Sequence, residues 1–181
     1  MGQPPMSALF PLPDRASPPT REMGFDLCID PNPRFVSVVR RFVEAAFDRL
    51  LCDAGAVFRV SMSAHELLEN AAKYSLGSKA LLRVSFKRLS DDDAQVSLYL
   101  SNETTPEHID RLRTRVMAIA GAPDPFGHYQ ALMRQNARAS DESGLGLARI
   151  RAEGEMNLEL EVRGNTVALL ANAHLDRGSL R

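Results

Sequence analysis

The chain has 181 residues, which is enough for one domain with a sizeable core and short for two. Its 22 basic and 23 acidic residues leave a formal charge of -1, which argues against a nucleic-acid-binding protein with a broad positive field. No apolar run approaches the roughly 20 residues that cross a bilayer, and Cys28 and Cys52 lack the spacing of a disulfide framework or a cysteine zinc site. We therefore expect a cytoplasmic protein without nucleic-acid or membrane partners.

The first 23 residues contain six of the eleven prolines and lack both a basic start and a continuous apolar segment. This composition is typical of disordered tails and differs from that of a signal peptide. It predicts a disordered, proline-rich leader over 1–23, with a partner-binding arm as the alternative.

The next residues predict one strand and two helices. Phe25, Leu27 and Ile29 alternate with polar residues, which is the period of a half-buried strand. Apolar residues then recur at helical spacing over 35–50 and again over about 57–74, and the segments "DAG" and "LGS" end these runs. Two amphipathic helices therefore follow the first strand.

The second half of the chain predicts two hairpins and two further helices. Between the helices, the segment 122–143 mixes proline and glycine with a short helical piece and a polar run, which indicates a mobile excursion more than a packed core element. The predicted elements are a hairpin over 80–100, a helix over 106–121, a helix that restarts behind Gly144 and a closing hairpin over 156–171.

This order of elements predicts the fold class. Because helices and strands are segregated along the chain, an α+β protein is expected, built as a two-layer α/β sandwich with helices on one face of a mixed or mostly antiparallel sheet. The domain is expected over 24–172, with a C-terminal tail over 173–181.

A polar stripe lies on the second predicted helix, in the segment "HELLENAAKYS". Glu66, Asn70 and Lys73 are four and three residues apart, so they share one helix face, away from the apolar side. An Asn70 oxygen suits Mg²⁺, a Lys73 ammonium suits a phosphate, and Glu66 could activate a hydroxyl. The alternative is a solvated helix face with a Glu69–Lys73 pair.

A second feature is the segment "ESGLGLARI", in which Gly144 and Gly146 precede a helix start. Free backbone N–H groups and the helix dipole favour an anion there, and glycine lets a phosphate approach. A tight turn that enters a helix is the alternative reading of these glycines.

Taken together, "HELLENAAKY" and "SGLGL" resemble the N box and the second glycine box of the Bergerat-fold (GHKL) ATPases, which include the histidine-kinase-like ATPase domains. The resemblance covers roughly residues 24–172. It implies ATP and Mg²⁺ as cofactors, with Asn70 as the Mg²⁺ ligand and Lys73 facing the phosphates. It also implies that Gly144, Leu145 and Gly146 cradle the phosphates and that 122–143 forms an ATP lid. Arg134 and Arg138 in this segment could reach the γ-phosphate, and a solvated helical face is the alternative.

The chain departs from that family at the first glycine box. Alternation along the preceding strand places the family's adenine-binding aspartate at Asn102, and the segment reads "NETTP", without either glycine. The Asn102 carboxamide could still accept a hydrogen bond from adenine, although without the strength that a charge gives. Thr104 and Pro106 stand where the family uses glycine, so this loop is expected to have a different shape.

The same segment contains part of a zinc-binding motif. His65 and Glu69 are four residues apart, as in an HExxH motif, but a glutamate stands where the second histidine is required. This reading is therefore disfavoured.

Two function classes remain open. A lone domain of this type most resembles the anti-sigma-factor type of serine/threonine kinase, with Glu66 as the catalytic base and a small antagonist or sigma-factor-like protein as partner in bacterial signalling. The alternative is a catalytically silent binding module that sequesters such a partner. The sequence favours the kinase and leaves open whether the chain forms a homodimer.

Overall fold

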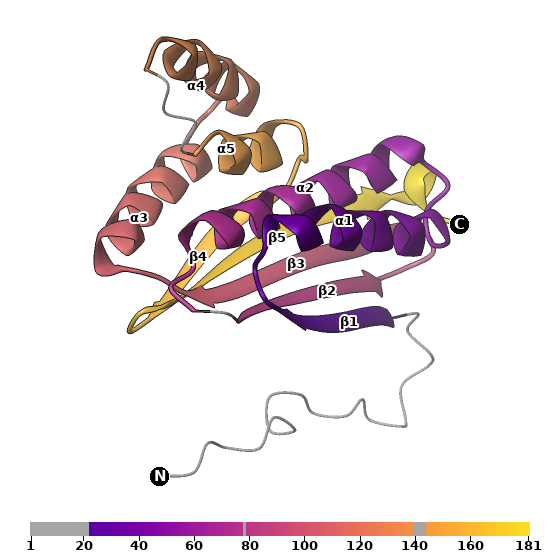
Figure 1. The fold of residues 1–181 in the computed structure, drawn as a ribbon. Coiled ribbons are helices and arrows are strands. Elements are labelled where there is room, and N and C mark those ends of the chain that lie inside the picture. Colours follow the sequence, from indigo (N-terminus) through magenta and orange to yellow (C-terminus); the bar gives the residue numbers. More distant parts are fainter. Residues whose placement is uncertain (1–21, 78, 140–143) are drawn as a thin grey trace.

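The computed structural model describes residues 22–77, 79–139 and 144–181 (Figure 1). The elements in chain order are β1 (Glu22–Ile29), α1 (Pro33–Asp48), α2 (Ala54–Tyr74), β2 (Ala80–Arg88), β3 (Asp93–Glu103), α3 (Pro106–Ala120), α4 (Pro125–Ala139), α5 (Leu145–Ala152), β4 (Asn157–Arg163) and β5 (Thr166–Asp176), followed by a short 3₁₀ helix (Arg177–Ser179).

The strands form one five-stranded sheet in the order β1-β2-β3-β5-β4, and each neighbouring pair is antiparallel. Figure 1 shows α1 and α2 lying across one face of this sheet, with α3 and α5 beside them. The predicted α+β class, the antiparallel sheet and the placement of the helices are therefore confirmed.

The hydrophobic core lies between the sheet and the helices. Alternate residues of β2 and β3, such as Leu82, Val84 and Leu98, are fully buried, because the pleat turns every second side chain toward the helices. Leu67 and Leu68 of α2 complete this core. The face of α2 that carries the polar stripe is consequently not part of this core and can form a functional site.

The C-terminal segment is part of the folded domain. Strand β5 continues to Asp176, and Leu180 is buried and forms a bridge with Leu51. Arg181 donates a hydrogen bond of 2.6 Å from Nε to the carbonyl oxygen of Leu51. The domain thus extends past the predicted boundary at 172 and includes the expected tail. The predicted leader falls almost wholly on 1–21, outside the described residues.

The predicted excursion contains a regular helix. Helix α4 has 15 residues, and Asp124 begins it by accepting a hydrogen bond of 2.9 Å from the N–H of Gly127. Tyr129 of α4 is buried, and Figure 1 shows α4 beyond α5, away from the sheet. The short helical piece expected within 122–143 is therefore a full helix over 125–139, while 140–143 lies outside the described residues.

Within the described part of the chain, no helix has both the length and the apolar character needed to span a membrane.

Candidate functional site: a cavity between α2 and α5

Both ends of helix α2 are fixed, which sets the position of its polar stripe. The Asp53 carboxylate caps the start by accepting hydrogen bonds from the N–H groups of Gly55 and Ala56. At the other end the hydroxyl of Thr104 donates a 2.7 Å hydrogen bond to the carbonyl oxygen of Tyr74. The last turn of α2 is therefore attached to the end of β3.

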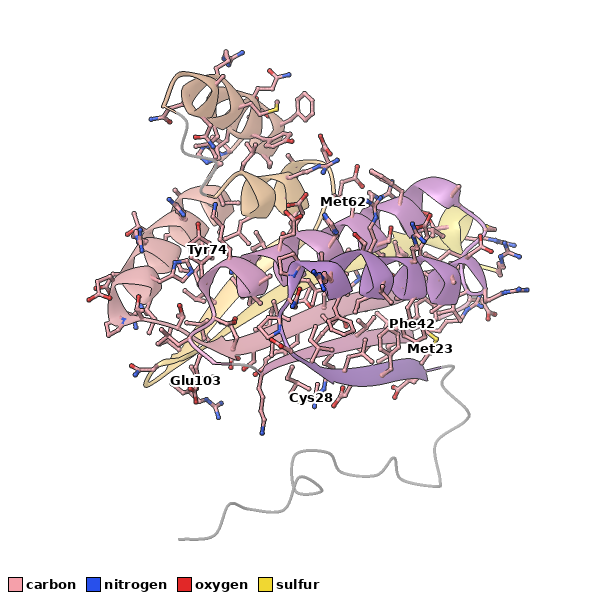
Figure 2. The ribbon with its side chains drawn as sticks, viewed as in Figure 1. Met23, Cys28, Phe42, Met62, Tyr74 and Glu103 are labelled. Atoms are coloured by element: carbon pink, nitrogen blue, oxygen red, sulfur yellow. The ribbon has the colours of Figure 1, made fainter. Side chains whose placement is uncertain are left out.

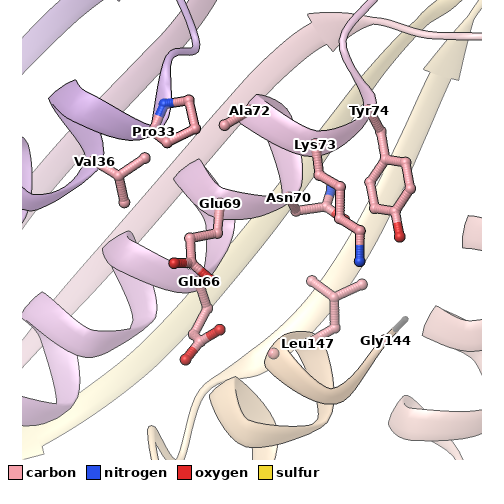
Figure 3. A pocket seen from close by; sticks show the side chains of 11 residues that line it. Pro33, Val36, Glu66, Glu69, Asn70, Ala72, Lys73, Tyr74, Gly144 and Leu147 are labelled. Atoms are coloured by element: carbon pink, nitrogen blue, oxygen red, sulfur yellow. The ribbon is translucent and has the colours of Figure 1, made fainter. Parts of the chain in front are cut away.

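A cavity of about 390 Å³ brings most of the predicted site residues together. Figure 3 shows Glu66, Asn70 and Lys73 on the side of α2 that faces α5. The other lining residues come from the start of α1, from the rest of this α2 face and from the start of α5: Pro33, Val36, Glu69, Ala72, Tyr74, Gly144, Gly146 and Leu147.

The turn that enters α5 depends on its two glycines. Gly144 has φ of 93°, in the left-handed region, and as the N-cap residue it provides no side-chain hydrogen bond to the first turn of α5. A Cβ at 146 would overlap Oε2 of Glu66, so any other residue there would displace that carboxylate oxygen. Leu145 does not line the cavity and packs against the core, whereas Leu147 takes a place in the lining.

Arg115 of α3 also reaches the glycine turn. A side chain at 144 would lie 2.9 Å from Cδ of Arg115 and 3.1 Å from its Nε, so the arginine passes directly over Gly144. Together with Lys73, it places positive charge near the first turn of α5. This arrangement favours an anionic ligand.

Glu66 is held in an ion pair. Its Oε1 accepts a 3.0 Å hydrogen bond from Nη1 of Arg149, and Nε of Arg149 donates a 2.6 Å hydrogen bond to Oε2 of Glu153. The bonds to Glu153 and to Glu66 raise the pKa of the Arg149 guanidinium. Only 11% of the Glu66 side chain is exposed, so its carboxylate depends on this partner.

Tyr129 extends this cluster to α4. Burial raises the pKa of its hydroxyl, and the nearby carboxylates of Glu153 and Glu66 add to the effect against an opposing contribution from Arg149. The cluster thus joins side chains from α2, α4 and α5.

Tyr74 lines the cavity, and Figure 2 shows it at the end of α2 that lies beside α3. Its ring stacks on His108, with 3.9 Å between ring centroids, and Lys73 Nζ lies 5.5 Å from the Tyr74 ring centre. His108 is only 4% exposed, and among the described residues neither of its ring nitrogens has a hydrogen-bond partner. Burial, aided by the nearby Arg111 and Arg115, lowers the pKa of His108.

Asn102 lies apart from this cavity. It is 5% exposed, its Nδ2 donates a 3.1 Å hydrogen bond to the carbonyl oxygen of Glu103, and it lines a second cavity of about 430 Å³ together with Cys28 and Lys79. Its predicted contact with adenine stays a prediction. No residue of the "NETTP" segment has a left-handed backbone conformation. Instead, the fully buried Thr104 donates a hydrogen bond to the end of α2, and Thr105 caps the start of α3.

The groups that line the cavity fit the phosphate end of a nucleotide. Asn70 offers an oxygen ligand for Mg²⁺, and Lys73 and the uncapped first turn of α5 suit phosphate oxygens. In the pair considered for zinc, Nε2 of His65 lies 3.2 Å from Oε1 of Glu69. The described residues contain no group of three histidine, cysteine or acidic side chains placed to hold a metal.

Three residues of the cluster were missed from the sequence. Arg149 and Glu153 stand at i and i+4 on α5, a spacing that predicts an ion pair but not its contact with Glu66 on another helix. Tyr129 lies in a segment where the sequence indicated a short helical piece, and nothing local predicted that its side chain is buried near Glu66.

Comparisons with known proteins address the fold. No protein-family model matches the chain, and no curated protein does. The chain is similar to one in the crystal structure of the SiaB–SiaC complex from Pseudomonas aeruginosa, with a TM-score of 0.58 and 13% sequence identity. The similarity covers 83% of this chain and 89% of that chain. At this identity it shows a shared fold and carries nothing about activity.

Proposed function

We propose that this chain is a Bergerat-type ATP-binding protein that transfers the γ-phosphoryl group of ATP, with Mg²⁺, to a serine or threonine of a small regulatory partner. The observation that carries the proposal is that one cavity gathers Glu66, Asn70 and Lys73 from α2 with Gly144 and Gly146 from the glycine turn. Its volume of about 390 Å³ lies within the range of roughly 300–1,000 Å³ typical of ligand pockets.

Each residue has a chemical role in this proposal. Asn70 would ligate Mg²⁺ through its carboxamide oxygen, and the ion would neutralise part of the phosphate charge. Lys73, Arg115 and the first-turn N–H groups of α5 would hold the phosphate oxygens. Glu66 would orient the acceptor hydroxyl and take its proton.

A protein partner is supported by the solved structure with the same fold, which is a complex of two proteins, SiaB and SiaC. The resemblance of a lone domain of this type to anti-sigma-factor-type kinases supports a small regulatory protein as that partner. Because fold similarity alone does not define a function, the proposal of a small protein partner depends on both of these observations.

The alternative function is a binding module that sequesters its partner without phosphoryl transfer. Two observations favour it: Glu66 is engaged by Arg149, and Asn102 lies outside the cavity that the other residues line. A module of this kind could bind nucleotide as a structural or switching ligand.

The two functions are separated by incubating the protein with γ-labelled ATP, magnesium and small proteins encoded by neighbouring genes. The kinase predicts label on serine or threonine of one partner, located by mass spectrometry, and loss of that label with Asn70→Ala. A partner that forms a stable complex and stays unlabelled in the presence of ATP and magnesium would support the sequestering module instead.

A further inference from the structure

Arg149 lies between two carboxylates that come from different helices. Nη1 contacts Glu66 of α2 at 3.0 Å, and Nε contacts Glu153 of its own helix at 2.6 Å. Because α5 also carries Gly146, the guanidinium links the helix of the glycine turn to the helix of the polar stripe. The position of Glu66 relative to the turn therefore depends on Arg149.

The two oxygens of Glu66 have different surroundings. Oε1 accepts the hydrogen bond from Arg149, whereas Oε2 lies where a side chain at 146 would project. Glu66 and Gly146 both line the cavity, so Oε2 is the oxygen that a ligand next to the glycine turn can reach. A carboxylate with one oxygen bound and the other available is restricted to one orientation.

We propose that Arg149 is the positioning residue for Glu66 and that Glu153 in turn restrains Arg149. This inference rests on the proposed kinase function and names how its base is held. Arg149 fixes Oε1, and Oε2 receives the proton of the acceptor hydroxyl. The hydroxyl oxygen forms its bond to the γ-phosphorus, and the bond from that phosphorus to the β,γ-bridging oxygen breaks, with its electron pair leaving on ADP.

The physical reason for this role is the burial of Glu66. A carboxylate whose side chain is only 11% exposed is costly to keep charged without a partner, and Arg149 is the cation that contacts it. Arg149 without Glu153 would be free to adopt other rotamers, so the second ion pair reduces the entropy cost of the first. The three side chains therefore act as a unit.

The first test needs no substrate and uses a double-mutant cycle on urea unfolding. Arg149→Met leaves a nearly buried carboxylate unpaired, so its unfolding midpoint should fall. Adding Glu66→Gln removes that charge, so the double variant should have a higher midpoint than Arg149→Met alone. Arg151→Met, on the same helix and without a salt bridge among the described residues, is the matched control. Strictly additive effects of the two substitutions would overturn the inference.

The second test measures phosphoryl transfer to the partner found with γ-labelled ATP. Arg149→Met should lower kcat by about 10–100-fold, with the KM for ATP changed by less than about threefold. Arg149→Lys, which keeps the charge, should recover part of this loss. The variant that combines Arg149→Met with Glu66→Gln should be no slower than Glu66→Gln alone, because Arg149 acts through Glu66.

The outcomes separate this inference from the proposed function. Faster transfer by Arg149→Met would show that the ion pair inhibits the base. Losses that multiply in the double variant would show that Arg149 acts on the nucleotide. Either result overturns the positioning role. If the wild-type protein labels no partner, the kinase and the proton transfer fail together, and the unfolding cycle alone then decides whether Arg149 holds Glu66.

Discussion

The hydroxyl of Thr104 donates a 2.7 Å hydrogen bond to the carbonyl oxygen of Tyr74, and this bond joins the end of β3 to the end of α2. Thr104 is fully buried, and it stands where the Bergerat-fold ATPases, which this sequence resembles, have a glycine. The N–H of Leu76 adds a 2.9 Å hydrogen bond to the carbonyl oxygen of Glu103. The departure from the family's first glycine box is therefore used to hold the helix that carries Asn70 and Lys73.

Thr104→Val should test this attachment. The variant keeps the shape of the side chain and leaves the Tyr74 carbonyl without its donor, so the free energy of unfolding in urea should fall by about 1–2 kcal/mol. Thr114→Val is the control, because Thr114 is exposed and its hydroxyl donates a hydrogen bond to the carbonyl oxygen of Asp110 within α3. Equal effects of the two substitutions would show that the Thr104 bond has no special importance.

Gly146→Ala should disturb the site while preserving the fold. The added methyl group would occupy the space of Glu66 Oε2, so the carboxylate must move, whereas alanine is a better helix former than glycine. We expect phosphoryl transfer to fall by about tenfold or more and the unfolding midpoint to stay close to that of the wild type. Gly77→Ala, where a methyl group would meet open space, should leave both quantities unchanged.

His108 should make stability depend on pH. Burial lowers its pKa below the ordinary 6.5, so between these two values the unfolded chain binds more protons than the folded protein. The stability from neutral His108 is complete above 6.5 and is lost as the pH falls toward the folded pKa, by at most about 1.4 kcal/mol per unit of lowering.

His108→Phe retains a ring against Tyr74 and removes the titrating group. Urea unfolding between about pH 5 and 8 should therefore show a shallower loss of stability for the variant than for the wild type. Phenylalanine at the half-buried His128 serves as the control. Parallel curves for His108→Phe and the wild type would contradict this account.

Local patterns in the sequence predicted the elements and the stripe of Glu66, Asn70 and Lys73, because helical periodicity fixes which residues share a face. They could not predict that Arg149 contacts Glu66, since the two residues are 83 positions apart and only packing brings their helices together. The sequence indicated only a short helical piece where α4 lies, because Pro125 and Gly127 appeared as breakers, although proline is favoured in the first turn of a helix.

The position of the C-terminal segment also could not be predicted from local sequence patterns. Residues 177–181 look like a polar end in the sequence, yet Leu180 is buried and Arg181 bonds to the backbone of Leu51. Such docking depends on a long-range contact that no local pattern reveals. The sequence placed Asn102 at the end of the strand that is β3. The alternation of side chains along that strand could not predict which cavity Asn102 lines.

Glu66→Gln should reduce phosphoryl transfer without reducing ATP binding to the same extent. The amide keeps the shape of the side chain and removes the proton acceptor, so phosphoryl transfer should fall by roughly 10²–10⁴-fold while ATP affinity is nearly kept. Transfer assays and binding measurements on the same preparation check this. Loss of ATP binding in this variant would instead place Glu66 among the ligands of the metal or the nucleotide.

The central claim, that the cavity between α2 and α5 binds ATP with Mg²⁺, is tested most directly by calorimetric titration of ATP into the wild type and Asn70→Ala, each with and without magnesium. Asn70 lines the cavity and offers the oxygen ligand, so we predict binding to the wild type only when magnesium is present and no binding to Asn70→Ala. Equal binding in all four titrations, or none in any, would contradict the account.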